Sequence, residues 1–431
     1  MDVNESISLN ETCMDLGCTK IYSIANPYLH SFSLCLYIKS GLMYESKDEK
    51  GVTHLFEHMV FRNLKNKYSE DFYRLLIKHK LTFNACTYKE FVQFEINGLP
   101  SGFGFAADVI CHIFDDICVS KTEYCSEVKR VKAEMRENSE KTTIGYFADK
   151  IAWNNTPLCE IISGSCGVLD KLSQRKMNEF KNKIFSSHNY FFYVTGNITE
   201  QQVNQLSDSI IKRVNIGNKE CLNRYNTAAV PADFSNRKLE INVKNSRYYI
   251  VRISFDADNE KCPLNVQNLL YSVLFEGDDS LVFKELSEDN PYVYSFDSTH
   301  EQYNNISMIK LEFEVSKRHL YDAVEKLCEL FFSIKRGEFS LENAVNKQIM
   351  RQKTLLDSPS ELNLHVAYEN HILRNKQAFF NDYTTVKKEA LISGAKEIFS
   401  VKNLVFALKG EKKSIDEQKL KNSLKKLDKI M

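Results

Sequence analysis

The stretch GVTHLFEHMVF, residues 51–61, decides how the first half of the chain is interpreted. Its apolar residues are too continuous for a half-buried strand and have the spacing of a buried helix. Residues four apart on a helix share a face, so the imidazoles of His54 and His58 can share one ion. Glu57 lies about one turn after His54, where it can reach a metal-bound water without binding the metal itself.

This pattern does not establish a metal site by itself. With ten histidines in 431 residues, composition alone produces an H-x-x-E-H match in about one or two of every hundred such chains. A buried histidine pair, with Glu57 in a local salt bridge, is the alternative. A third protein ligand separates the two cases, because catalytic zinc takes three protein ligands and a water.

The segment KTEYCSEVKRVKAEMRENSEK, residues 121–141, predicts a helix that could supply this ligand. It opens with Ser120 and Glu123 at the spacing of a capping box. Glu127 and Glu134 are seven residues apart and therefore point in nearly the same direction. Periodicity does not choose between them, and two solvated surface carboxylates would give the same pattern.

The length and charge of the chain limit the other possibilities. At 431 residues, two domains of about 200 residues each are expected rather than one core. Lys plus Arg and Asp plus Glu both number 57, so nothing points to nucleic acid or an anionic membrane as partner. The polar, acidic start MDVNESISLNET is unlike a signal or transit peptide, and no apolar run is long enough for a membrane span. We expect a cytoplasmic protein.

Two segments of the chain resemble each other. IFSSHNYFFYVTG (184–196) and IFSVKNLVFALKG (398–410) share Ile, Phe, Ser, Asn, Phe and Gly at the same offsets. Each predicts a helix end, a turn at Asn189 or Asn403, and a strand closed by glycine. This indicates an internal duplication, with chance similarity of two strands as the alternative.

The repeat divides the chain into a first domain (1–215), a polar linker (216–237) and a homologous second domain (238–431) that lacks the histidine motif. Alternating strands such as FVQFEIN and SMIKLEFEV occur among amphipathic helices. The predicted fold class is therefore α+β, with two tandem, internally duplicated domains, each a largely antiparallel sheet covered by helices.

The motif HLFEHMVF resembles the inverted zinc motif of the insulinase/pitrilysin family, the inverzincins. In that family a glutamate about 75 residues after the second histidine is the third ligand, and a glutamate one heptad earlier supports it. Counted from His58, this resemblance implies Glu134 as the third ligand and Glu127 as the supporting residue. It further implies one Zn²⁺ per chain and Glu57 as the general base of peptide hydrolysis.

The resemblance extends to nearly the whole chain, more weakly in its second half. LTFNACTYKEFVQFEI (81–96) is similar to the edge strand on which the family binds peptides, which implies Asn84 and Ala85 as substrate-binding residues. One departure follows the motif, where the family commonly has Gly-Thr and this chain has Arg62 and Asn63. We expect a changed loop there.

A second departure concerns the partner. The family's second half supplies an Arg and a Tyr seven residues apart that hold the substrate carbonyl. Here Tyr294 falls on the tyrosine position, but Ser287 stands where arginine is expected, and serine has no fixed charge. Family members of this length act as pairs. The resemblance therefore favours a heterodimer whose homologous subunit supplies the Arg/Tyr pair, with a homodimer as the alternative.

The resulting prediction is a zinc-dependent endopeptidase that hydrolyses peptides or small unfolded proteins in a chamber formed with a second subunit. It would act either in turnover or in processing a peptide. The alternative is a non-catalytic, peptidase-like subunit that binds peptides or scaffolds a complex.

Overall fold

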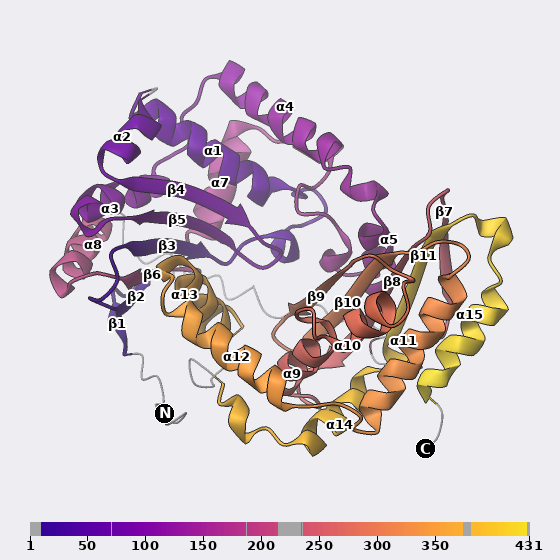
Figure 1. Cartoon of the computed structure of the whole chain (residues 1–431). Helices are drawn as coiled ribbons and strands as arrows, with labels where there is room; N and C mark the ends of the chain where they lie inside the picture. Colours follow the sequence, from indigo (N-terminus) through magenta and orange to yellow (C-terminus); the bar gives the residue numbers. More distant parts are fainter. Residues whose placement is uncertain are drawn as a thin grey trace. The chain divides into compact units, whose positions relative to one another are not determined.

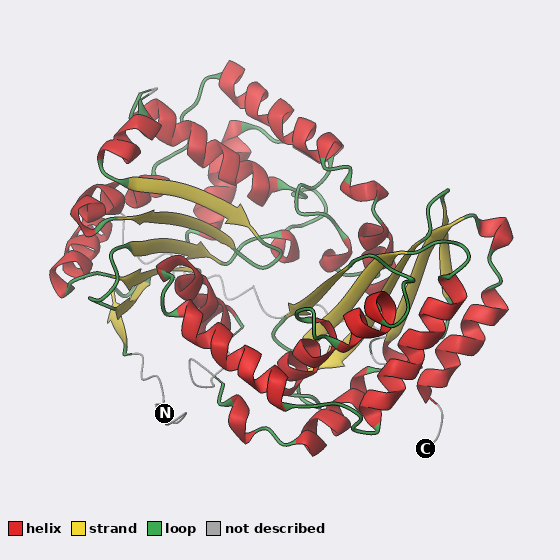
Figure 2. Cartoon of the chain, viewed as in Figure 1, coloured by secondary structure: helices red, strands yellow, loops and turns green. Residues whose placement is uncertain are grey.

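The computed structural model describes residues 10–69, 71–186, 188–213, 234, 236–373 and 381–428 (Figure 1). It divides into two compact units. The first comprises Met1–Ser139, Glu160–Asn226 and Thr354–Phe380, and the second comprises Glu140–Cys159, Thr227–Lys353 and Asn381–Met431. Each unit combines one sheet with covering helices (Figure 2), which confirms the predicted α+β class. The predicted linker, 216–237, falls almost entirely outside the described residues.

In the described part of the first unit, the sheet has six strands in the order β1-β2-β6-β3-β5-β4. Only the pairing of β2 with β6 is parallel. The central strand β3, FSLCLYI, is buried along its whole length, as a continuous apolar run predicts for a strand covered on both faces. β4 is an edge strand. The strands are β1 Glu11–Asp15, β2 Lys20–Ala25, β3 Phe32–Ile38, β4 Leu81–Thr87, β5 Val92–Gly98 and β6 Tyr190–Gly196.

Helices cover both faces of this sheet. On one face, α1 buries Phe56 and Met59 in a core that includes Phe94 of β5. On the other face lies α13, whose buried Asn363 accepts a hydrogen bond from Tyr37 and donates one to the backbone of Tyr193. The helices of this unit are α1 Val52–Lys67, α2 Phe72–Lys78, α3 Phe103–Cys111, α4 Lys121–Glu137, α6 Cys166–Leu169, α7 Gln174–Ile184, α8 Glu200–Arg213 and α13 Pro359–Val366.

The start of α1 is fixed by a neighbouring carboxylate. Glu45 accepts hydrogen bonds from the backbone N–H groups of Gly51 (2.7 Å) and Thr53 (2.9 Å), which have no partner within the helix. Gly51 has a φ of 87°, and a Cβ there would lie 2.6 Å from the carbonyl oxygen of Ser163. Glycine is therefore required where the chain enters the helix that carries the histidines.

Among the residues described for the second unit, the sheet has five strands in the order β7-β11-β8-β10-β9, in which β7 and β11 pair in parallel and the other neighbours are antiparallel. The strands are β7 Ile241–Asn245, β8 Ile250–Asp258, β9 Phe296–Gln302, β10 Ile306–Glu314 and β11 Leu404–Gly410. The helices are α5 Ile144–Ala152, α9 Leu264–Phe275, α10 Leu281–Phe283, α11 Leu320–Lys335, α14 Lys388–Ile398 and α15 Glu417–Leu424. α12, Glu342–Leu355, belongs to this unit except for its last two residues.

The predicted repeat recurs in equivalent places of the two sheets. α7 and α14 end at Ile184 and Ile398, and β6 and β11 follow, each parallel to one neighbour and antiparallel to the other. The side chain of Asn189 donates to the carbonyl of Ile184 (2.7 Å), and Asn403 donates to that of Ile398 (3.0 Å). These matched contacts agree with an internal duplication.

The two units are not continuous along the chain. Residues 140–159, with α5, belong to the second unit, and residues 354–380, with α13, belong to the first. The domain boundaries predicted from the sequence did not include this exchange. Amphipathic periodicity indicates that a helix packs on a sheet, but it does not indicate which sheet.

No helix in the described ranges combines the length and the apolar character needed to cross a membrane.

Candidate metal centre

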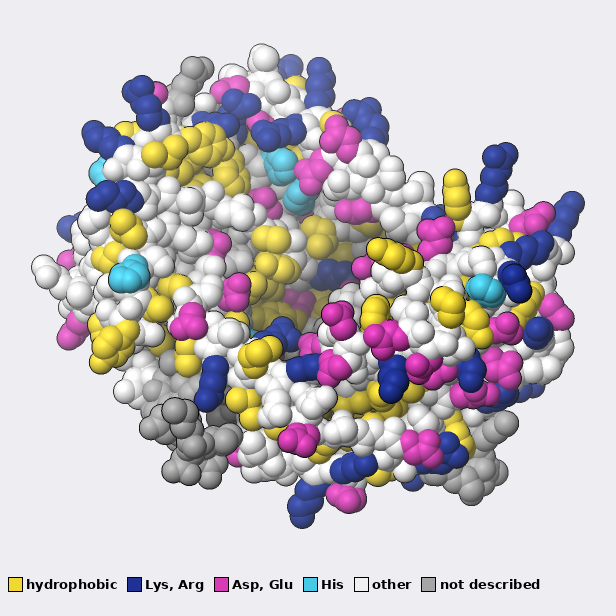
Figure 3. All heavy atoms as spheres, viewed as in Figure 1, with side chains coloured by type: hydrophobic (Ala, Val, Ile, Leu, Met, Phe, Trp, Pro, Cys, Tyr) yellow, Lys and Arg dark blue, Asp and Glu magenta, His cyan; other side chains and the backbone are white. Residues whose placement is uncertain are grey.

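Three predicted ligands meet between α1 and α4. His54, His58 and Glu134 each offer an atom that lies within 4.8 Å of the other two. Nε2 of His54 is 3.8 Å from one oxygen of Glu134, and Nε2 of His58 is 3.5 Å from the other oxygen. The two imidazole rings lie edge to face, with centroids 4.8 Å apart. In Figure 3, histidine side chains lie next to acidic ones over α1 and α4.

This donor set fits a small divalent ion. Ligands about 2.0–2.1 Å from a tetrahedral zinc lie about 3.3 Å from one another. The two nitrogen–oxygen distances, 3.8 and 3.5 Å to different oxygens of Glu134, are somewhat longer, so small side-chain movements would bring the three residues to ligand distance. Two imidazole nitrogens and one carboxylate oxygen are also a common ligand set of catalytic zinc. The protein thus has a His-His-Glu group that could hold a metal ion.

The surroundings keep His54 unprotonated. Burial, and next the nearby His58, lower the pKa of His54 to about 4, although the Glu134 carboxylate acts in the opposite direction. A neutral imidazole has a free lone pair, which metal binding requires. Nδ1 of His54 is buried and has no hydrogen-bond partner among the described residues.

His58 differs from His54 because the carboxylate of Glu127 lies next to its ring. One oxygen of Glu127 lies 3.6 Å from Nδ1 of His58. The other oxygen accepts hydrogen bonds from Nε (3.0 Å) and Nη2 (2.7 Å) of Arg62. His58, and next Arg62, hold the pKa of Glu127 at about 2, so the carboxylate stays ionised. An ionised partner at Nδ1 keeps the proton there and leaves Nε2 for a metal.

The expectation of a changed loop at Arg62 and Asn63 is wrong. The departure after Phe61 does not produce a changed loop, because α1 continues without interruption to Lys67. Leu64, which is buried, extends the apolar spacing of the motif by another turn. The departure therefore places a guanidinium on the helix, where it binds Glu127.

Glu57 lies between α1 and the edge strand. Its carboxylate accepts a hydrogen bond from Oγ1 of Thr87 (2.6 Å), at the end of β4. Burial raises the pKa of Glu57, while Thr87 and His58 act in the opposite direction. Sequence reasoning missed Thr87 and the role of Arg62. Both act through contacts between separate elements, which no local pattern in the sequence reveals.

The predicted substrate-binding residues Asn84 and Ala85 lie in the middle of β4 and pair with Glu95 and Phe94 of β5. Asn84 is exposed and Ala85 is half-buried. Among the described strands, β4 pairs with β5 alone, so its other edge offers unpaired backbone groups. Their role in substrate binding stays a prediction.

Tyr294 and Ser287 lie in the second unit. Tyr294 is 96% exposed. Ser287 donates a hydrogen bond through Oγ to the carbonyl of Val293 (2.8 Å). Their relation to the histidine site stays a prediction.

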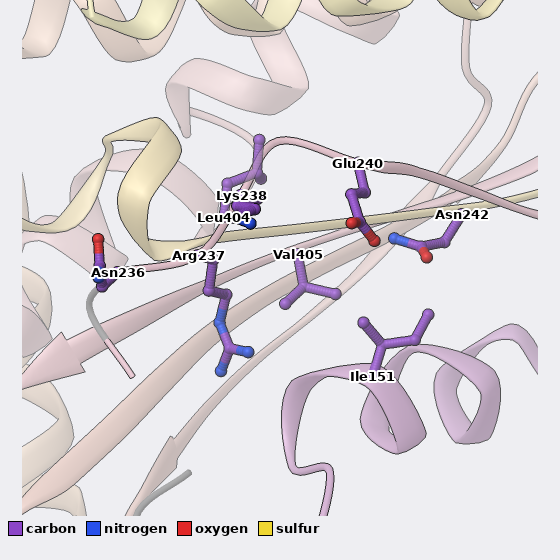
Figure 4. A pocket seen from close by; sticks show the side chains of 8 residues that line it. All are labelled: Ile151, Asn236, Arg237, Lys238, Glu240, Asn242, Leu404 and Val405. Atoms are coloured by element: carbon purple, nitrogen blue, oxygen red, sulfur yellow. The ribbon is translucent and has the colours of Figure 1, made fainter. Parts of the chain in front are cut away.

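The second unit has a cavity of about 260 Å³, lined by residues of α5, β7, β11 and the segment before β7 (Figure 4). Its charged Arg237 is already bound, to Asp256 (2.6 Å) and to the carbonyl of Ala152 (2.7 Å). Among the described residues that line it there is no histidine or cysteine. The described part of this lining therefore lacks the imidazole donors that make the first unit a candidate metal centre.

The fold and the site together define a class of protein. A helix with two histidines, a glutamate from a later helix and an adjacent edge strand occur in one of two related α+β units. This is a peptidase-like architecture.

The chain belongs to the insulinase family. The family described as "Insulinase (Peptidase family M16)" matches residues 20–164. The family described as "Peptidase M16 inactive domain" matches residues 171–348. These matches confirm the resemblance stated from the sequence.

Known relatives are distant but similar over most of their length. The uncharacterized zinc protease YmxG of Bacillus subtilis is 21% identical over 385 residues, which are 87% of this chain and 92% of that protein. A protease from Helicobacter pylori has a similar fold, with a TM-score of 0.81 at 16% identity, over 93% of this chain and 99% of that one. A peptidase M16 inactive domain from Pseudomonas fluorescens has a TM-score of 0.79 at 12% identity, over 93% and 98%.

Proposed function

We propose that this chain is a zinc-dependent endopeptidase that hydrolyses peptides or small unfolded proteins. The proposal rests on the convergence of His54, His58 and Glu134. Glu57 lies on α1, the helix that also carries the two histidines. A zinc ion bound there would polarise the carbonyl of the cleaved bond and lower the pKa of the attacking water.

Glu57 performs the proton transfer in this proposal. It takes a proton from the attacking water and later delivers it to the leaving amine. The hydrogen bond from Thr87 holds one carboxylate oxygen of Glu57 and leaves the other for this transfer. Since no residue forms a covalent bond to the substrate, the cysteines and serines of the chain need no nucleophilic role.

The substrate binds along β4. An extended peptide adds to the open edge beside Asn84 and Ala85 as a further strand, held by backbone hydrogen bonds. Thr87 ends the same strand and contacts Glu57, so a peptide paired with β4 is led toward the catalytic carboxylate. Backbone pairing tolerates many side chains.

A second, homologous subunit closes the chamber and supplies an Arg/Tyr pair. We infer this second subunit because Ser287 stands where the family has arginine. The hydroxyl of Ser287 donates a hydrogen bond to the carbonyl of Val293 and cannot replace a guanidinium. Co-expression with a neighbouring homologous gene, followed by mass measurement of the purified complex, tests this pairing. A fully active preparation of this chain alone would contradict it and favour the homodimer.

The alternative function is a non-catalytic subunit that binds peptides or scaffolds a complex. The match of residues 171–348 to the family described as "Peptidase M16 inactive domain" is the observation that favours this alternative. The presence of all four residues of the proposed centre favours the enzyme, because a subunit without activity has no need of Glu57.

Metal analysis combined with a peptide-cleavage assay separates the two functions. The enzyme should contain zinc and lose activity with a chelator. Glu57→Gln should keep the zinc and abolish cleavage, whereas undiminished cleavage by this variant would refute the assignment. The predicted cytoplasmic location is part of the proposal, and fractionation of cells tests it.

A further inference from the structure

A pocket of about 200 Å³ opens beside the candidate metal centre. It lies within the first unit and is formed by side chains of α1, α2 and α4. Glu57 and His58 belong to its lining, so the pocket is continuous with the place where hydrolysis is proposed to occur. A side chain that entered it would belong to a substrate residue next to the cleaved bond.

The charges of the pocket do not balance. Among the described residues that line it are three cations, Arg62, Lys65 and Arg130, and two carboxylates, Glu57 and Glu127. Arg62 is already committed to Glu127 by two hydrogen bonds. The remaining cations therefore outnumber the one carboxylate that is left.

Lys65 and Arg130 are available to a ligand. Nζ of Lys65 lies 4.8 Å from the centre of the Tyr73 ring, a cation–π contact that holds the ammonium group at the pocket without neutralising it. Arg130 is exposed on α4. Neither side chain forms a close ion pair within the described part of the chain, and the charge of Arg130 acts on Glu127 only at longer range.

Two aromatic rings complete the lining. Tyr73 is 45% exposed, and Phe61 packs against Phe83 of β4 with ring centroids 4.9 Å apart. Such rings can cover the methylene groups of a ligand side chain and reduce the screening of its charge by water. The contact with Phe83 also joins the pocket to the strand on which the substrate is proposed to bind.

We propose that this pocket binds the carboxylate of an acidic residue of the peptide substrate, adjacent to the bond that is cleaved. The inference rests on the proposed endopeptidase function and gives it a substrate class. An Asp or Glu side chain meets Lys65 and Arg130. A Lys or Arg side chain meets two like charges and is excluded.

A series of fluorogenic peptides tests the proposal. The peptides have blocked ends and one sequence, in which Asp, Asn or Lys is placed in turn at each position. At one position next to the cleaved bond, Asp should give a kcat/KM about tenfold above Asn, the effect of two exposed ion pairs, with Lys below both. Equal rates for Asp, Asn and Lys at every position would overturn the inference.

Charge reversal identifies the residues. Lys65→Glu and Arg130→Glu should each lower the preference for Asp, and the double variant should prefer Lys. This gain of a new preference cannot result from misfolding. Lys129→Glu is the matched control, because it makes the same charge change on the neighbouring residue of α4, outside the pocket lining. An unchanged Asp preference in the double variant would contradict the proposal.

Binding is measured separately from turnover. The Glu57→Gln variant should bind the Asp peptide about tenfold more tightly than the Asn peptide in a fluorescence anisotropy titration. Peptides that end at the same position with a free or an amidated terminus show whether a terminal carboxylate serves instead, and a preference limited to the free terminus would overturn the claim for a side chain. Absence of cleavage of any peptide would count against the proposed function, whereas cleavage without charge preference would count against the pocket alone.

Discussion

Arg62 of α1 and Glu127 of α4 form a pair in which both Nε and Nη2 of the guanidinium donate to a single carboxylate oxygen, at 3.0 and 2.7 Å. The other oxygen of Glu127 is left for Nδ1 of His58. Arg62, which stands where the family commonly has glycine, therefore orients Glu127, the supporting carboxylate of the candidate metal centre.

Removal of the guanidinium should weaken metal binding. Arg62→Leu leaves Glu127 free to rotate and is expected to lower the zinc affinity about 10- to 100-fold, the usual effect of losing an outer partner of a metal ligand. Competition with a fluorescent chelator measures this affinity. Lys67→Leu, on the same helix but outside the site, should bind zinc as the unchanged protein does, and an equal loss in both variants would show that helix stability is responsible.

The two glutamates of α4 should behave differently. Glu134→Gln removes a proposed ligand, so the purified protein should lose most of its zinc. Glu127→Gln should retain zinc with an affinity lower by about 10- to 100-fold. Elemental analysis after dialysis against a weak chelator compares them. A stronger loss in Glu127→Gln would reverse the proposed roles.

Thr87 should affect catalysis without affecting the metal. Thr87→Val removes the hydrogen bond to Glu57, and hydrogen bonds to charged groups contribute about 1.5–3 kcal/mol. We expect kcat to fall at least about tenfold, with unchanged zinc content. Thr82→Val is the control, since Thr82 lies in the same strand and, within the described residues, its hydroxyl donates to the backbone carbonyl of Asn97 and not to Glu57. Equal rates for the two variants would contradict a positioning role.

Glu90 should make the stability of the first unit depend on pH. Burial raises the pKa of this carboxyl to about 7, although the Tyr368 hydroxyl opposes the shift. The pKa of Glu90 is higher in the folded than in the unfolded protein, so folding favours the protonated carboxyl. Its contribution to the free energy of unfolding is therefore fully present below pH ~4.5 and is lost as the pH rises through 7. The loss amounts to about 3 kcal/mol.

Thermal unfolding of Glu90→Gln at pH 5 and pH 8 measures this effect. The variant should be more stable than the unchanged protein at pH 8 and have a flatter profile between the two. Glu137→Gln, an exposed control on α4, should follow the unchanged protein. Identical profiles for all three proteins would show that Glu90 does not titrate in this range.

Local patterns in the sequence predicted much of the fold. The apolar spacing around His54 predicted α1, and the capping box of Ser120 and Glu123 is present, with both reciprocal hydrogen bonds. The predicted helix over 121–141 ends earlier, at Glu137. The duplicated segments predicted the equivalent strands β6 and β11, because each strand and its preceding turn are specified by nearby residues.

Contacts between distant elements were beyond such patterns. Periodicity left Glu127 and Glu134 equivalent, and only the packing of α4 against α1 turns one toward Nδ1 of His58 and the other toward both Nε2 atoms. The Thr87 contact depends on where β4 ends relative to α1, and the exchange of α5 and α13 depends on which sheet had an uncovered face. These are properties of tertiary packing, which a window of sequence does not contain.

Anomalous diffraction measured on both sides of the zinc absorption edge, from crystals of the protein grown with zinc, tests the central claim most directly. The account predicts one peak per chain, about 2 Å from Nε2 of His54, Nε2 of His58 and a carboxylate oxygen of Glu134. Zinc bound elsewhere, or Glu134 turned to solvent with no peak between the two imidazoles, would contradict it.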